Sequence, residues 1–214
     1  ENQRDVVLNE RRQNYENRPY GLAAMALVAA LYPPDHPYHW LTIGAAEDLR
    51  TARLEDVHQF FKTYYHPGNA SLAFAGDVDT DHAIALAQRY FEEITRGPVV
   101  PPVDVPGAVA PPDGEARLVL EDRVELPRLY LSWRTPALFA QGDAELDLLA
   151  DILASGKASR LYRLLVHDRR IATDVSASQN SGELGSFFYV VATASPGHDL
   201  AELEQVITEE LGRL

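Results

Sequence analysis

The sequence predicts an α+β fold in which helices are layered on mostly antiparallel sheets. Three observations support this prediction: helical apolar spacing dominates the first half, alternating apolar residues open the second half, and a Pro- and Gly-rich segment lies between them. The 214 residues are 46% hydrophobic and 24% charged, which is enough apolar material for a sizeable core. A wholly disordered chain is therefore excluded.

Residues 98–115 hold the densest run of proline and glycine in the chain. Proline lacks the backbone N–H that helices and strands use, and it favours extended chain. We therefore expect a linker at 98–115, between one domain portion at 1–97 and another at 116–214.

The first half is predicted to be mostly helical. An apolar helix is expected over 21–31, and Thr51 is expected to cap a second helix. The apolar stripe of that second helix consists of Leu54, Val57, Phe61 and Tyr64. Residues 71–75 are predicted to form a short buried strand, and a further helix is expected to start at Thr80 or Asp81.

The second half is predicted to contain both strands and helices. The expected strands are 117–121, 128–134, 173–179 and 187–193. Gly182 and Gly185 signal a hairpin between the last two strands. Helices are expected after Asp143, from Ser159 and after Asp199, whose side chain can cap the last helix.

Composition excludes several classes of function. The chain has 19 Lys and Arg against 32 Asp and Glu, a formal charge of −13, so its overall field does not favour nucleic acid or anionic lipid. There is no cysteine, which excludes disulfides, thiolate metal sites and thiol catalysis. No apolar run is long enough to predict a membrane span.

No complete catalytic motif occurs in the sequence. H-E-x-x-H, H-x-x-E-H and G-x-S-x-G are all absent. His36 and His39 are three residues apart, but the neighbouring prolines predict a turn, so packing is expected there rather than metal binding. Glu1, Asp5 and Glu10 lie beside an apolar segment, and their spacing alone predicts a solvated helix face.

Five ordered stretches nevertheless resemble the insulinase/pitrilysin family of zinc peptidases, which includes the mitochondrial processing peptidases. They are Glu1-x-x-Arg4-Asp5-Val6-Val7-x-x-Glu10, YPPDHPY at 32–38 with Thr42-Ile43-Gly44, FFKTYYHPGN at 60–69 with LAFAGD at 72–77, LASGKASRLYR at 153–163, and the hairpin region 174–188. Each stretch is a weak signal alone. Together they cover nearly the whole chain in the family's order.

The resemblance implies homologous α+β domains that enclose a chamber in which peptides are cleaved. In this family two histidines of H-x-x-E-H and a downstream glutamate hold the zinc. Glu1 falls at that glutamate, and Glu10 is the competing candidate. The H-x-x-E-H segment is then expected upstream, so 1–97 would be the C-terminal half of the zinc-site domain and 116–214 the N-terminal part of the second. This chain alone is expected to be inactive and to bind no zinc.

The resemblance also has an informative gap. Many family members use an Arg and a Tyr to hold the substrate, and here Val166 and Thr173 stand at those positions. This favours the zinc-bearing subunit of a pair whose homologous partner supplies Arg and Tyr. The alternative is a non-catalytic scaffold or binding subunit. Self-association of the chain is also expected, and the frequent export of bacterial relatives favours the periplasm.

Overall fold

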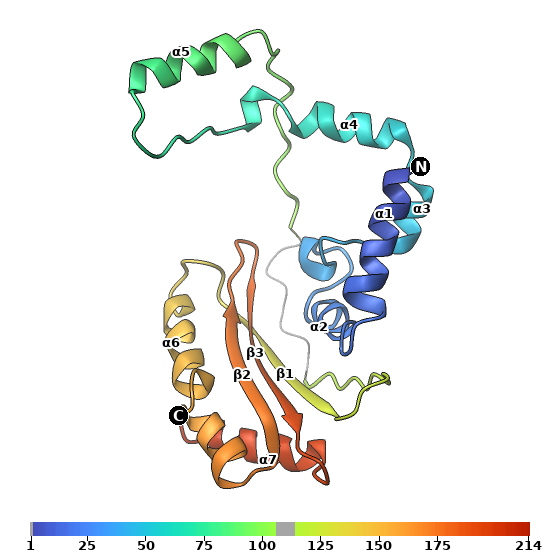
Figure 1. Ribbon diagram of the computed structural model, residues 1–214, viewed down its shortest axis with the longest axis vertical. Coiled ribbons are helices and arrows are strands. Elements are labelled where there is room, and N and C mark those ends of the chain that lie inside the picture. The colour runs from blue at the N-terminus through green and yellow to red at the C-terminus, as the bar shows by residue number, and fades with distance from the viewer. Residues whose placement is uncertain (1, 106–113) are drawn as a thin grey trace. The chain divides into compact units, whose positions relative to one another are not determined.

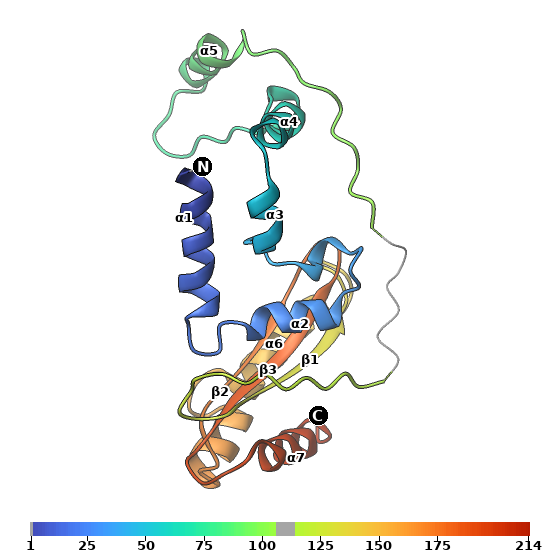
Figure 2. The same cartoon turned by 90° about the vertical axis from the view of Figure 1, so that its right-hand side faces the viewer.

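The computed structural model describes residues 2–105 and 114–214, which form two compact units (Figures 1 and 2). Unit 1 consists of the residues up to Leu8 together with Gly44–Asp104. Unit 2 consists of Asn9–Ile43 together with Val105–Leu214. The units therefore interleave along the chain, and the domain boundaries around 98–115 remain predictions.

Unit 1 is built from helices joined by extended segments. Its elements are the start of α1 (Asn2–Arg11), α3 (Ala46–Thr51), α4 (Leu54–Tyr64), the 3₁₀ turn η3 (Pro67–Asn69) and α5 (Thr80–Phe91). The helix predicted from Thr80 is thus confirmed. Asp79 caps it by accepting a hydrogen bond from the His82 N–H at 2.8 Å.

Thr51 does not cap the following helix, so that prediction is wrong. Thr51 ends α3, where its hydroxyl donates to the carbonyl oxygens of Glu47 and Asp48 at 3.1 and 3.2 Å. The helix α4 begins later, and the Asp56 carboxylate accepts the Arg53 N–H at 2.8 Å. A carboxylate in the first turn satisfies a backbone donor that has no partner within the helix.

Unit 1 has no buried residue among its described positions. The α4 stripe has the predicted spacing, yet Leu54 is 66% exposed and Phe61 53% exposed. The strand predicted at 71–75 is also wrong, because these residues are exposed and belong to no sheet. A strand requires a hydrogen-bonded neighbour, and none of the described residues supplies one here.

Unit 2 holds the sheet and most of the remaining helices. Its elements are the π-helical turn η1 (Arg12–Glu16), α2 (Ala23–Leu31), the 3₁₀ turn η2 (Pro37–His39), β1 (Arg128–Thr135), α6 (Asp143–Ala154), the π-helical segment η4 (Tyr162–Asp168), β2 (Ala172–Asn180), β3 (Ser186–Ala194) and α7 (Leu200–Leu211). The strand order is β1-β3-β2 and both pairings are antiparallel. Helices with a small antiparallel sheet confirm the predicted α+β class. Residues 117–121 are exposed and not a strand, which corrects that prediction.

The central strand β3 carries the core of unit 2. Phe188, Val190 and Ala192 alternate along it and are buried in one cluster with residues from α6, η4 and α7. The helical members of this cluster include Leu153, Leu161, Leu165, Leu203 and Ile207, all 0% exposed. Burying each such side chain stabilises the fold by about 1.5–3 kcal/mol. The sheet and its helices are therefore the best-packed part of the chain.

A second, smaller cluster involves α2. Val28, Leu31 and Tyr32 are buried there, with Phe187 of β3 packed against them. Because Phe187 alternates with Phe188, this cluster lies on the other face of the sheet from the main core. The apolar helix predicted over 21–31 is thus confirmed in its main part.

No helix formed by residues 2–105 or 114–214 is long and apolar enough to cross a membrane.

Candidate functional site

Of the two candidate zinc-ligand positions, the structure describes only Glu10. Glu1 lies outside the described residues, and Glu10 is an exposed residue of α1. Residues 2–105 and 114–214 contain no cluster of three or more His, Asp or Glu side chains that could hold a metal ion. Since zinc sites in proteins use three or four protein ligands, the described donors do not fit one by themselves.

His36 and His39 instead hold a turn together, as the flanking prolines predict. His36 is 1% exposed, and its Nδ1 accepts a hydrogen bond from the Tyr38 N–H at 3.0 Å. The ring of His36 stacks on Tyr32 with 4.6 Å between centroids. His39 Nδ1 donates to the Tyr32 carbonyl oxygen at 2.6 Å. One ring nitrogen of each imidazole is thus committed to the turn.

The aromatic turn formed by Tyr32, His36 and Tyr38 packs against the tip of the β2–β3 hairpin. The Tyr38 hydroxyl accepts the Leu184 N–H at 3.3 Å, and a Cβ on Gly182 would lie 2.8 Å from the Tyr38 ring. Burial raises the pKa of Tyr32, and nearby Arg134 only partly offsets this. The contact explains why glycine stands at the hairpin tip: a larger residue would displace the tyrosine.

Val166 and Thr173, at the positions of the family's substrate-holding pair, lie on different elements of unit 2. Val166 is part of η4 and packs partly buried against the core. Thr173 lies exposed on β2, where its hydroxyl is 3.1 Å from Asp174 Oδ2 and 3.4 Å from the Thr193 carbonyl oxygen. Neither side chain supplies a positive charge or a phenol.

Asp143 forms a polar network that the sequence did not reveal. It is 5% exposed and accepts hydrogen bonds from Ser181 Oγ at 2.6 Å, Gln179 Nε2 at 3.1 Å and the Phe139 N–H at 2.9 Å. These hydrogen bonds lower the pKa of Asp143, the bond from Ser181 having the largest effect, and they outweigh burial, which raises it. Gln179 and Ser181 are far away in sequence, so only the start of α6 could be predicted at this residue.

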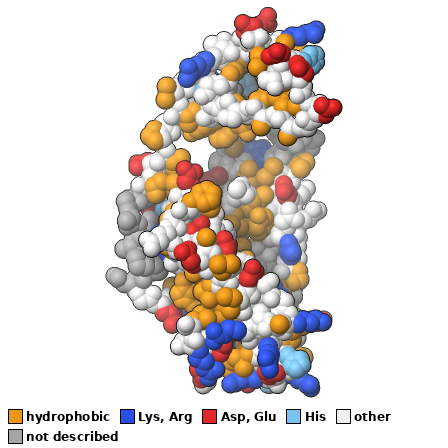
Figure 3. Space-filling model, turned by 90° about the vertical axis from the view of Figure 1, so that its left-hand side faces the viewer, with side chains coloured by type: hydrophobic (Ala, Val, Ile, Leu, Met, Phe, Trp, Pro, Cys, Tyr) orange, Lys and Arg blue, Asp and Glu red, His pale blue; other side chains and the backbone are white. Residues whose placement is uncertain are grey.

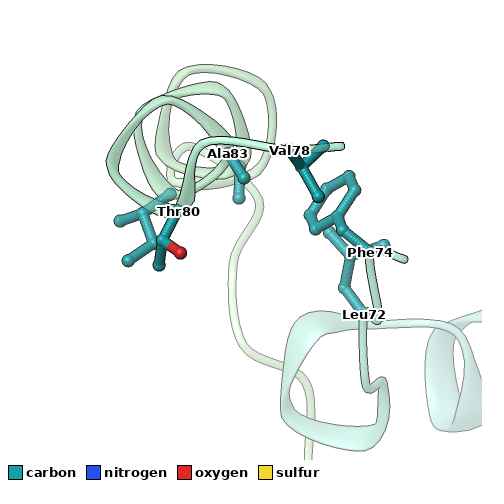
Figure 4. A pocket seen from close by; sticks show the side chains of 7 residues that line it. Leu72, Phe74, Val78, Thr80 and Ala83 are labelled. Carbon is teal, nitrogen blue, oxygen red and sulfur yellow. The ribbon is translucent and has the colours of Figure 1, made fainter. Parts of the chain in front are cut away.

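Unit 1 contains an apolar pocket of about 330 Å³ between its extended segment and α5 (Figure 4). Its lining consists of Leu72, Phe74, Val78, Thr80, Ala83, Ile84 and Ala87. Phe74 and Ile84 are 53% and 52% exposed, so the pocket is open to solvent. Its lining offers hydrophobic contact, and Thr80 is its one polar side chain.

Comparison with protein-family models identifies the family to which the chain belongs. Residues 51–214 match the family model described as the peptidase M16 inactive domain. The chain belongs to the M16 peptidase family. This confirms the resemblance to the insulinase/pitrilysin peptidases, which was based on weak ordered motifs.

Individual M16 relatives agree with this assignment. The chain is 29% identical over 99% of its length to the zinc protease PqqE of Helicobacter pylori, and it covers 48% of that protein. It is 31% identical over 98% of its length to an uncharacterized zinc protease of Mycobacterium leprae, covering 46% of it. A crystal structure of a Helicobacter pylori protease superimposes on 98% of the chain with a TM-score of 0.85 and 28% identity, covering 50% of that structure. The chain therefore spans about half the length of these relatives.

Proposed function

We propose that this chain is part of a longer zinc-dependent endopeptidase that cleaves peptides inside a chamber enclosed by homologous domains. The observation that carries the proposal is the match to M16 proteins about twice as long that are named zinc proteases. The described residues do not build a metal site, so no catalytic step is assigned to them. Their proposed role is to shape the enclosure, while the chain's one proposed zinc ligand, Glu1, lies outside them.

Within this proposal, Glu1 supplies one zinc ligand and Glu10 does not. Glu10 is exposed on α1 and belongs to no group of three or more possible metal ligands among the described residues, which supports assigning the ligand to the other acidic position. The test uses the longer protein with its preceding sequence. Glu1→Gln is expected to remove bound zinc, measured by elemental analysis, and cleavage of a quenched fluorescent peptide.

Glu10→Gln is the matched control, because it makes the same chemical change on the same segment. It is expected to retain zinc and activity. If Glu10→Gln loses both while Glu1→Gln keeps them, the ligand assignment is reversed and the peptidase proposal stands. If the longer protein binds no zinc and cleaves no peptide, the peptidase proposal itself is wrong.

The second candidate function is a non-catalytic scaffold or binding subunit. The description of the matching family model as an inactive domain favours it. The same experiment separates the two functions, since a scaffold subunit binds no zinc in the longer wild-type protein. A peptide would then bind without being cleaved.

We further propose that the zinc-bearing protein works with a homologous partner that supplies the missing Arg and Tyr. The support is that Val166 is packed against the core and Thr173 is a small hydroxyl, so neither can anchor a peptide through charge or a phenol. The longer protein alone is expected to cleave peptides slowly and to be activated on adding the partner. Full activity without any partner would exclude the paired arrangement.

The isolated chain is proposed to self-associate through unit 1. Its exposed apolar side chains on α4, on the extended segment and on α5 remain uncovered by the described residues, and exposed apolar patches promote association. Light scattering should show a mass above 23.7 kDa that increases with concentration. A monomer at high concentration would contradict this. The periplasm remains the expected compartment, to be measured by cell fractionation of the longer protein.

A further inference from the structure

Residues 157–170 form a basic segment in an otherwise acidic chain. Its cationic side chains are Lys157, Arg160, Arg163, Arg169 and Arg170. Asp168 is the only carboxylate within the segment, whereas the whole chain has 32 acidic and 19 basic residues. The segment therefore carries a local positive charge opposite in sign to that of the whole chain.

The fold presents these cations to solvent. Leu161 and Leu165 are fully buried and anchor the segment to the core of unit 2. The Arg163 side chain is 73% exposed, and Lys157, Arg169 and Arg170 are also exposed. Figure 3 shows Lys and Arg side chains, with a His among them, gathered at one end of unit 2. The apolar residues thus fix the segment while its charges face outward.

Nearby carboxylates neutralise only part of this charge. Asp168 lies 2.9 Å from His167 Nδ1 and 3.7 Å from Arg163 Nε. Glu210 of α7 is shared by Arg160 at 2.7 Å and by Arg213 at 3.1 Å.

Lys157, Arg169 and Arg170 make no side-chain ion pair within the described part of the chain. A group of guanidinium and ammonium donors is consequently left without carboxylate acceptors. Guanidinium groups match the two oxygens of a carboxylate and often bind it through two parallel hydrogen bonds.

We propose that the basic segment binds an acidic stretch of a partner polypeptide. At physiological salt, charges interact over about 8 Å, so a short peptide with several Asp or Glu side chains responds mainly to the local cations. A nucleic acid or an anionic bilayer extends well beyond that range and meets the negative surface of a chain with a charge of −13. The charge pattern therefore favours an acidic peptide over these larger polyanions. This binding is independent of zinc and goes beyond the proposed peptidase function.

Substitution of Arg170 by glycine removes a positive charge and leaves the backbone conformation unchanged. Its φ is +58°, in the left-handed region that glycine adopts at little cost. Arg170→Gly is therefore expected to fold at least as well as the wild type, with an unchanged Tm. Any loss of binding in this variant reports on the side chain rather than on unfolding.

The test measures binding of a fluorescein-labelled peptide of alternating glutamate and serine to the 214-residue chain by fluorescence anisotropy. Arg169→Glu/Arg170→Glu is expected to weaken binding by about tenfold or more, and Arg170→Gly by a smaller factor. Raising the salt from about 0.1 M to about 1 M shortens the screening length from about 10 Å to about 3 Å and should also weaken it.

Arg18→Glu/Arg123→Glu is the matched control, because it makes the same change in net charge at two exposed arginines of unit 2 outside the basic segment. It is expected to bind the glutamate peptide as the wild type does. Equal weakening by the control would show that only the overall field matters and would overturn the proposal. So would equal binding of the glutamine version of the peptide, or binding of anionic vesicles or DNA in place of the peptide.

Discussion

In unit 2, α6 places Leu153 in a fully buried position within the core, whereas in unit 1 the equally regular α4 leaves Leu54 66% exposed. Both helices have apolar residues at helical spacing, so sequence periodicity does not distinguish them. The difference lies in what covers the apolar face. For α6 the cover is the sheet of the same unit.

For α4, no described residue of unit 1 is buried, so its apolar face has no cover of the same kind. Amphipathic spacing indicates that one face of a helix packs against another element, but it does not identify that element. Two other parts of unit 1 are also uncovered by its described residues. They are the apolar pocket beside α5 and the unpaired segment at 71–75. These features leave the apolar surface of unit 1 uncovered by the described residues of that unit.

The largest effect that sharpens this comparison is expected from core truncation. Leu165→Ala in unit 2 should lower the free energy of unfolding by about 2–5 kcal/mol, because Leu165 is 0% exposed and its removal leaves a cavity. At a protein concentration low enough to keep the chain monomeric, Phe61→Ala on α4 should change it by less than about 0.5 kcal/mol, because Phe61 is 53% exposed. Urea denaturation followed by circular dichroism at that concentration measures both. Equal losses in the monomer would show that unit 1 itself covers α4 in solution.

The same contrast explains which parts of the fold the sequence predicted. The hairpin of β2 and β3 was found because alternation, glycine signals and a neighbouring strand all occur within one local stretch. Residues 71–75 and 117–121 have comparable strand-like patterns, yet they are extended without a ladder partner. Pattern alone predicts an extended backbone, and pairing depends on distant residues.

The candidate site was predictable to a different degree. The family could be recognised because its motifs are local and ordered, and the comparisons confirm it. The absence of charge and phenol at Val166 and Thr173 could also be read from the sequence. The Asp143 network could not, because Ser181 joins Asp143 only after the sheet and α6 have packed together. Contacts between distant residues are a product of the fold and leave no spacing signal.

A smaller effect is expected at the hairpin tip, where unit 2 is packed against its own aromatic turn. A Cβ on Gly182 would lie 2.8 Å from both the Tyr38 ring and the Gly185 carbonyl oxygen. Gly182→Ala should therefore lower the free energy of unfolding by about 1–3 kcal/mol.

Gly212→Ala is the control for that substitution, since a Cβ there meets nothing closer than 3.5 Å and its φ of −67° suits alanine. It should leave stability within about 0.5 kcal/mol of the wild type. A neutral Gly182→Ala would mean that the turn separates readily from the hairpin tip.

The smallest expected effect is on the pH dependence of stability, which tests whether the hydrogen-bond network around Asp143 stabilises unit 2. Hydrogen bonds from Ser181, Gln179 and the Phe139 N–H lower the folded-state pKa of Asp143 below its ordinary value of 3.8. As the pH falls below about 4, the unfolded chain takes up a proton that the folded chain does not, so this contribution to stability is lost with increasing acidity. Above that range the contribution is fully present.

Asp143→Asn removes this titration and should flatten the loss of stability below about pH 4, by at most one bound proton. Glu204, whose pKa Arg117 lowers, and Glu210, whose burial is outweighed by Arg160 and Arg213, titrate in the same direction in both proteins. Their contributions therefore cancel in the difference between wild type and variant. Urea midpoints measured from about pH 3 to pH 7 give that difference. If the urea midpoint falls equally steeply with acid in both proteins, Asp143 does not make these hydrogen bonds in solution. The buried apolar core alone would then distinguish unit 2 from unit 1.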